Sequence, residues 1–443
     1  LVAAGLLAGL PAQAAGKKAA SAKAAPAKAQ AKAAGPARST RAKAGAAVAS
    51  GAAVQRVSSA QPEPEVRLLQ VITQVERGQL DEAIKLAARL TEDVPNFKLA
   101  QLVYADLLRY RAGRFQGAGA IAQSTHSGPG GAVLVKHQLA PAVLSDSELQ
   151  EQLQGLQLEL KRRVLATGSP PAAGMVPADV LQLGASVRHV IAIDESKSRL
   201  YLFANEAGSL RLSASYYVSV GKMGLGKQQE GDLRTPQGLY FVGRHIPGPR
   251  LPAFYGKGAL TVNYPNDWDR AMGRAGSGIW LHGAPPDQFA RLPHASDGCV
   301  VLANPDLLAL TRTVDRQTPV LIRESLHWVE PQDRAQQAAA HSFQAVLDEW
   351  RKTRQTADAR KLASLYAAGS TGAEGLSERV AAYFDGAGAS LDDVSIYAWK
   401  EARGEVRIVN FRLGSRAFSQ PLGLRQYWQK TASGWKILSE DTL

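Results

Sequence analysis

The 443-residue sequence contains a single cysteine, Cys299. One thiol cannot form an internal disulfide, so this side chain is either a buried apolar residue or a working thiol. Long apolar runs are also absent, since none reaches the roughly 18 residues that span a bilayer, and we expect no transmembrane segment. No nucleotide-binding glycine loop, metal-ligand cluster or base-reading motif is present. We therefore expect no cofactor, no metal and no nucleic-acid partner.

The net charge of +13 is concentrated near the start of the chain. Nine basic residues precede the first acid, Glu63, which leaves a surplus of about four for the rest. That surplus is ordinary for a protein of this size, so the charge does not predict nucleic-acid binding. A short apolar stretch followed by Ala12-Gln13-Ala14 is typical of a signal-peptide cleavage site. We interpret residues 1–14 as a truncated signal peptide and expect export.

Residues 15–62 are almost entirely Ala, Lys, Gly, Ser and Pro. Because few side chains there could build a core, this composition predicts a disordered tether. It serves either as a plain spacer or as a weak electrostatic attachment to an anionic envelope surface.

Residues 63–167 show helical periodicity. Apolar stripes lie on either side of Gly78, and RGQLDEAIKLAARLTEDVPNFKLAQLVYADLL resembles a tetratricopeptide-type hairpin. A later heptad-spaced stripe runs from Leu149 to Val164. It could form a homodimer seam, but a helix packed on its own domain is the more common outcome.

The rest of the chain predicts a linker and two further domains, so the fold class is multidomain α+β. Residues 168–186, with GSPPAAGMVP, form the linker. Residues 187–328 carry alternating β-branched and aromatic strands and predict a β-rich domain. Residues 336–443 have helices first and then four strands. They resemble the NTF2-like (SnoaL-like) fold, most specifically in GWKI…E at the end.

Cys299 closes a glycine turn, and His282 ends the apolar strand GIWLHG. A cysteine nucleophile needs a base to form the thiolate, and histidine is the usual one. We therefore expect a thiol of lowered pKa paired with His282, with His294 as a rival base. Gly298 permits positive φ, so the N–H groups of Gly298 and Cys299 could bind an oxyanion. Asn304-Pro305-Asp306 predicts a helix start with Asn304 as N-cap.

These motifs resemble a known family. His-Gly followed by S-x-G-C, with GKMGLGKQQEGDLRTPQGLYFV and NYPNDWDRAMGRAGSGIWLHG upstream, looks like the YkuD-type L,D-transpeptidase catalytic domain over residues 187–324. The resemblance implies a periplasmic or wall location, no metal, and a cysteine acyl-enzyme on peptidoglycan stem peptides. It assigns Cys299 as nucleophile, His282 as base, and Gly283 as the carbonyl that orients the imidazole.

The sequence departs from the common family pattern at two positions of the nucleophile turn. After Ser296, the usual histidine is replaced by Asp297, and an arginine often found after the cysteine is Val301 here. An acid beside the nucleophile opposes thiolate formation unless it points away or pairs with a base. Because this arginine is missing, the residue that binds a substrate carboxylate is not identified by the family pattern. The candidates for substrate contact are Tyr264, Lys222, Arg270, Arg274 and Arg291.

The resemblance implies acyl transfer, but the motif does not encode the acceptor. An amine acceptor gives a 3-3 crosslink by L,D-transpeptidation, which we favour; water gives trimming to a tripeptide by L,D-carboxypeptidation. The domain order is also similar to that of cell-shape L,D-carboxypeptidases of curved bacteria. The departures at Asp297 and Val301 keep a third hypothesis open, a catalytically silent wall-binding scaffold.

Overall fold

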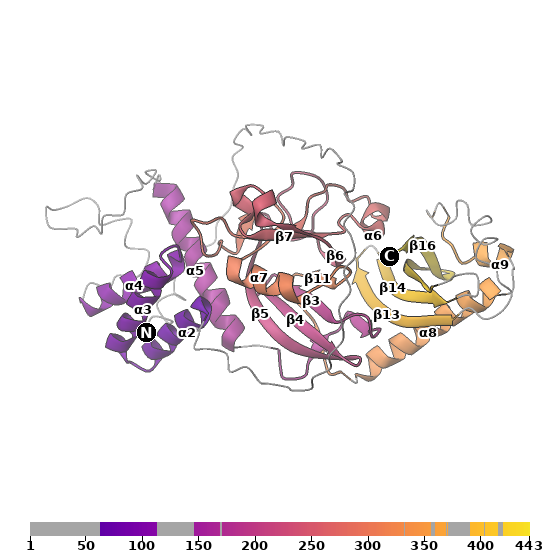
Figure 1. Ribbon diagram of the computed structural model, residues 1–443, viewed down its shortest axis with the longest axis horizontal. Helices are drawn as coiled ribbons and strands as arrows, with labels where there is room; N and C mark the ends of the chain where they lie inside the picture. Colours follow the sequence, from indigo (N-terminus) through magenta and orange to yellow (C-terminus); the bar gives the residue numbers. More distant parts are fainter. Residues whose placement is uncertain are drawn as a thin grey trace, which may run out of the picture.

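The computed structural model describes residues 63–112, 146–168, 171–331, 333–355, 359–368, 370, 390–402, 404–414 and 420–443. The predicted signal peptide and tether lie outside these residues. Three units follow one another along the long axis of the molecule (Figure 1), a helical unit at one end, a β-rich unit in the middle and a second sheet at the other end. Within the described ranges, no helix combines the length and the apolar character needed to cross a membrane.

The helical unit is the predicted hairpin extended by two further helices. It contains α2 (Pro64–Glu76), α3 (Leu80–Asp93), α4 (Lys98–Arg111) and α5 (Asp146–Gly168). Gly78, with φ of +73°, separates α2 from α3 as predicted. On α5, Leu160 is buried in the core of this unit, and Leu156 and Val164 pack against it. That part of the heptad stripe therefore covers its own domain, which confirms the more common outcome and leaves the predicted dimer seam without support.

The β-rich unit is one mixed sheet whose ends join. Its strands are β3 (His189–Asp194), β4 (Arg199–Glu206), β5 (Ser209–Gly221), β6 (Gly238–Pro247), β7 (Gly258–Val262), β8 (Trp280–Gly283), β9 (His294–Ser296), β10 (Val300–Leu302) and β11 (Pro319–Arg323). The order is β10-β8-β7-β6-β11-β3-β4-β5-β9, and β10 also pairs with β5. Short helices η2 (Gly248–Arg250), η3 (Ala253–Tyr255), α6 (Asp267–Ala271) and α7 (Asn304–Thr313) connect the strands.

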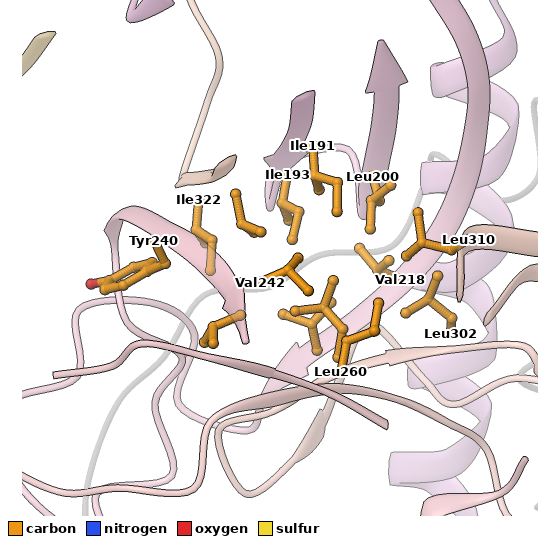
Figure 2. Packing of buried hydrophobic residues seen from close by; sticks show 14 of the residues in the cluster. Ile191, Ile193, Leu200, Val218, Tyr240, Val242, Leu260, Leu302, Leu310 and Ile322 are labelled. Carbon is orange, nitrogen blue, oxygen red and sulfur yellow. The ribbon is translucent and has the colours of Figure 1, made fainter. Parts of the chain in front are cut away.

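The core of this unit explains its strand pattern. Alternate residues such as Ile191 and Ile193 point inward and meet Leu260 from β7 and Leu310 from α7 (Figure 2). All four are at most 3% exposed, and burial of side chains of this size contributes about 1.5–3 kcal/mol each. This packing fixes β8 and β10, the two strands on which the predicted nucleophile and base depend.

The predicted linker contains two strands, which corrects the sequence interpretation. β1 (Val176–Pro177) pairs with β12 (Trp328–Val329), and β2 (Val180–Gln182) pairs with a strand of the last unit. Asp179 between them binds the Arg323 guanidinium, which stacks on Trp399 at 3.9 Å. Pairing partners roughly 150–220 residues away leave no local signal, so a Gly/Pro-rich segment resembles a linker.

The C-terminal unit is the predicted antiparallel meander on a helix. It contains α8 (Arg334–Gln355), α9 (Ala359–Ala363), β13 (Ser390–Glu401), β14 (Gly404–Gly414), β15 (Leu422–Thr431) and β16 (Gly434–Thr442), and β2 joins it to give the order β16-β15-β14-β13-β2. One sheet face packs on α8 through Phe343 and Trp350. The other face shares a core with the β-rich unit, where Tyr397 meets Phe241 at 5.9 Å. The NTF2-like assignment remains a resemblance.

Candidate active site

The candidate nucleophile and base lie on neighbouring strands. β8 and β10 run parallel, with Val301 opposite His282 and Val300 opposite Leu281. Leu281 and Val300 enter the core, so strand alternation directs His282, and Cys299 just before β10, to the opposite face. A strand spacing of about 4.8 Å and a rise of about 3.3 Å per residue separate the two backbones by about 8 Å. A thiol and an imidazole can bridge that gap.

Two hydroxyl groups hold the turn that carries Cys299. Ser296 Oγ donates to the Cys299 carbonyl at 2.5 Å and accepts from the Gly298 N–H at 3.1 Å. Thr235 Oγ1 donates to the Gly298 carbonyl at 2.8 Å. Gly298 has φ of +128°, and a Cβ there would lie 2.8 Å from the Arg234 carbonyl oxygen. Only glycine fits this position without strain.

The same hydrogen bonds reduce the number of backbone N–H groups that could bind an oxyanion. The Gly298 N–H already donates to Ser296 Oγ inside the turn. Of the two N–H groups predicted from the sequence, that of Cys299 remains the candidate for an oxyanion. Ser296 and Gly298 therefore shape the turn.

His282 is held by its neighbour and by a residue that the sequence analysis assigned elsewhere. Its Nδ1 donates to the Gly283 carbonyl at 2.8 Å, the contact that the family resemblance implies. Asn304 Oδ1 accepts from the Lys257 N–H at 2.8 Å, and Asn304 Nδ2 donates to the Ala284 carbonyl at 2.8 Å. Asn304 is thus the first residue of α7, whose N-cap is Ala303, and the predicted N-cap role is wrong. Its side chain instead fixes the strand end behind His282.

Aromatic rings enclose the imidazole. Tyr255 lies 5.0 Å from the His282 ring and Phe254 lies 5.8 Å from it, both from η3, while Trp280 stacks on Tyr255 at 5.0 Å. His282 is 1% exposed, and this burial lowers its pKa to about 4. Because the Gly283 carbonyl can only accept, the neutral ring carries its proton on Nδ1 and leaves a lone pair on Nε2. His282 can therefore accept a proton at Nε2 at neutral pH.

The thiol is also neutral, which corrects a prediction. Cys299 is half-buried, its Sγ donates to the Gly278 carbonyl at 3.4 Å, and burial raises its pKa. The backbone N–H of Trp280 opposes this rise, and the charge of Asp297 adds to it. The expected low-pKa thiol is wrong because the turn withdraws the sulfur from water. The sulfur is nevertheless not sealed among aliphatic side chains.

Asp297 is exposed and turned toward a lysine. Its Oδ1 lies 2.9 Å from Lys222 Nζ, and the two side chains are 65% and 53% exposed. The acid that replaces the usual family histidine is thus paired with a base, one of the two ways in which its charge could be tolerated. Solvent screens such an exposed pair, so it modulates the thiol weakly.

The rival base is occupied on another part of the sheet. His294 Nε2 lies 2.5 Å from Glu195 Oε1. Arg162 of α5 binds the same carboxylate at 3.2 Å and the Glu195 carbonyl at 2.7 Å. His294 therefore belongs to a contact between the helical unit and the sheet, and the structure favours His282 as the base.

Three of the predicted substrate-contact residues, Tyr264, Arg274 and Arg270, bind other residues of the protein. Tyr264 is 6% exposed and donates its hydroxyl to the Ala275 carbonyl at 3.0 Å. Arg274 binds Asp269 and Glu401, which joins the β-rich unit to β13. Arg270 pairs with Asp267 on its own helix. The structure gives no support to these three predicted substrate contacts, which remain predictions. Partner choice across units does not show in the sequence. Arg291 acts electrostatically on the thiol, and Lys222 pairs with Asp297 in the nucleophile turn.

Several residues that build the site escaped the sequence analysis: Thr235, Phe254, Tyr255, Trp280 and Asn304. Thr235, Trp280 and Asn304 stand in segments quoted as motifs, and Asn304 was assigned to a helix cap. Among the described residues, no three His, Cys, Asp or Glu side chains gather in a way that could hold a metal ion.

Residues 188–322 match the family model of the L,D-transpeptidase catalytic domain, YkuD. The chain carries a YkuD-family domain. The matched range begins one residue before β3 and ends within β11, so it covers the whole nine-stranded sheet, including β8, the nucleophile turn and β10. The recognised family and the observed site therefore occupy the same unit, as the sequence motifs predicted.

Individual proteins extend the likeness found for residues 188–322. YafK of Escherichia coli (strain K12), whose name places it provisionally among the L,D-transpeptidases, is 34% identical over 94 residues, which are 21% of this chain and 37% of YafK. Bd1075 of Bdellovibrio bacteriovorus has a similar fold, with a TM-score of 0.50, 24% identity, and coverage of 60% of this chain and 98% of Bd1075. Pgp2 of Campylobacter jejuni is described as a helical cell shape determining protein. Its TM-score is 0.46 and its identity 20%, with coverage of 62% of this chain and 97% of Pgp2.

Proposed function

We propose that this chain is a peptidoglycan-modifying enzyme in which Cys299 and His282 catalyse acyl transfer on stem tetrapeptides. The observation that carries the proposal is that a half-buried thiol and a neutral imidazole, whose Nδ1 is held by the Gly283 carbonyl, lie on the same face of two neighbouring strand segments. His282 stands on β8 and Cys299 immediately precedes the adjacent strand β10, both within the matched YkuD range. A nucleophile, a base and a group that orients the base form the arrangement required for covalent acyl transfer.

The first half-reaction follows from these protonation states. His282 Nε2 takes the thiol proton as Cys299 Sγ attacks the carbonyl that precedes the terminal residue. The Cys299 N–H stabilises the developing oxyanion. The tetrahedral intermediate then collapses, and its C–N bond breaks. The departing amine takes the proton from His282, which leaves a tripeptidyl thioester on Cys299 and restores the neutral imidazole.

The acceptor completes the reaction in the reverse order. An amine or water gives a proton to His282 and attacks the thioester, and the thiol recovers that proton as it leaves. An amine acceptor makes the enzyme an L,D-transpeptidase, which we favour on the matched catalytic domain; water makes it an L,D-carboxypeptidase. The proposed compartment is the periplasm, where such substrates lie.

The test compares the wild-type protein with Cys299→Ala on disaccharide tetrapeptides by mass spectrometry. Crosslinked dimers from the wild type alone are the expected result for transpeptidation, and tripeptides alone indicate trimming. His282→Ala should abolish either product, because in this mechanism His282 removes the thiol proton. Identical traces from the wild type and Cys299→Ala would overturn the enzyme proposal and leave the wall-binding scaffold.

A further inference from the structure

Arg291 lies beside the aromatic rings that enclose His282. It belongs to the segment between β8 and β9, and its Cζ sits 4.2 Å above the centre of the Phe254 ring. That ring is 5.8 Å from the imidazole of His282. The Arg291 charge acts on both reacting groups, since it lowers the pKa of His282 and of Cys299. The guanidinium is therefore close enough to act electrostatically on both reacting groups.

This guanidinium has unused hydrogen-bonding capacity. Its Nη1 donates to the Ala295 carbonyl at 3.3 Å, while its Nε is buried and has no acceptor. The other predicted cations differ, because Lys222, Arg270 and Arg274 each bind a carboxylate. Among the described residues, Arg291 has no carboxylate within ion-pair distance. A partly buried guanidinium with unfilled donors is stabilised when a carboxylate arrives.

The backbone that carries Arg291 is fixed by the helical unit. The Arg291 carbonyl accepts from the Tyr217 hydroxyl at 3.0 Å, and the Tyr217 ring stacks on Arg163 of α5 at 3.8 Å. In the same segment, Phe289 donates its N–H to the Asn96 carbonyl at 3.1 Å and packs on Phe97 at 4.5 Å. Such anchoring lowers the entropic cost of holding a charged group in position.

We propose that Arg291 binds the terminal carboxylate of the stem peptide, so that the enzyme removes a single residue from a free carboxyl end. This inference rests on the proposed function. A carboxylate one residue beyond the scissile carbonyl lies within about 3.6 Å along the chain, a step that the Arg291 side chain can cover. Both acceptors use the same donor peptide, so the role of Arg291 is independent of the choice between crosslinking and trimming.

The experiment compares two tetrapeptides that differ only at the C-terminus, a free carboxylate and a carboxamide. The proteins are the wild type, Arg291→Gln, Arg291→Lys and the control Arg244→Gln, whose arginine is exposed on β6. We expect the wild type and the control to prefer the free acid by at least about tenfold in kcat/KM. Arg291→Gln should raise KM for the acid by a similar factor and change KM for the carboxamide far less. Arg291→Lys should keep part of the preference.

Two outcomes overturn the role of Arg291. One is an Arg291→Gln variant that retains the preference for the acid, and the other is equal loss on both substrates, which indicates a structural effect. Calorimetry on Cys299→Ala separates this proposal from the proposed function, because it measures binding without turnover. Tighter binding of the acid than of the carboxamide, lost in Cys299→Ala/Arg291→Gln, supports the proposal even when no product forms. Equal binding of both peptides to Cys299→Ala overturns it.

Discussion

At the scale of single residues, the reacting groups are both held neutral. Burial lowers the pKa of His282 to about 4 and raises that of the Cys299 thiol. A resting thiolate–imidazolium pair is therefore disfavoured at neutral pH. The proton must cross from sulfur to Nε2 during the attack, so the geometry of the pair matters more than the intrinsic acidity of the thiol.

Asp297 should slow the alkylation of the Cys299 thiol. Its charge raises the pKa of Cys299, so Asp297→Asn should lower that pKa and speed alkylation by iodoacetamide at pH 7.5 by about two- to threefold, a modest factor because the acid is exposed. The wild-type thiol should react more slowly than free cysteine at the same pH. Glu206→Gln, which removes an exposed charge on β4, is the matched control. An unchanged or slower rate in Asp297→Asn would contradict the electrostatic role.

His282 should make stability fall in acid. Its folded pKa of about 4 lies below the ordinary 6.5, so the unfolded chain binds this proton more readily. The stabilisation is complete above pH 6.5 and is lost as the pH falls toward 4, which amounts to about 3 kcal/mol. Denaturant unfolding at several pH values should show this extra loss in the wild type but not in His282→Gln. The exposed His341→Gln should keep the wild-type slope, and equal slopes in all three proteins would refute the assignment.

At the scale of elements, the alternation of residue types along the sequence predicted which segments form strands. It did not predict which strands pair with one another. β3 to β5 and the meander β13 to β16 stand where β-branched and aromatic residues alternate. β2 was missed because three residues carry almost no periodic signal, and its partner β13 begins more than 200 residues later. Asn304 was misassigned for a similar reason. Asparagine is a common N-cap residue, but the side-chain amide of Asn304 instead forms hydrogen bonds with the backbone of Lys257 and Ala284 at the strand ends.

At the scale of the whole molecule, the helical unit is docked on the catalytic sheet by buried charges. Arg163 of α5 binds Glu65 of α2 at 2.7 Å and Glu159 at 2.8 Å, and Glu65 also binds Arg199 of β4 at 2.7 Å. Arg163 stacks on Tyr217, which in turn holds the backbone of Arg291. The helical unit thereby contacts the segment that carries Arg291.

Disrupting the ion pairs of Arg163 should destabilise the protein and increase the mobility of residues 284–292. Arg163→Ala leaves two carboxylates without their shared cation, and removing one partner of a buried pair costs about 3–5 kcal/mol. Denaturant unfolding should report that loss, and hydrogen exchange should rise in residues 284–292. Arg67→Ala breaks a pair whose acid is 46% exposed, so it should cost below about 1 kcal/mol and leave that segment protected. Equal effects of the two substitutions would contradict the docking role of Arg163.

The sequence alone determined the helical, β-rich and C-terminal units, the identity of Cys299, His282 and Gly283 as a candidate site, and the family to which the catalytic unit belongs. These properties depend on periodicity and on a motif with fixed spacing, both local along the chain. Tertiary structure decided the protonation states of the pair, the partners that Arg274 and Tyr264 bind, and the unpaired state of Arg291 among the described residues. Burial and charge pairing decide these properties, and both depend on residues brought together from distant parts of the chain.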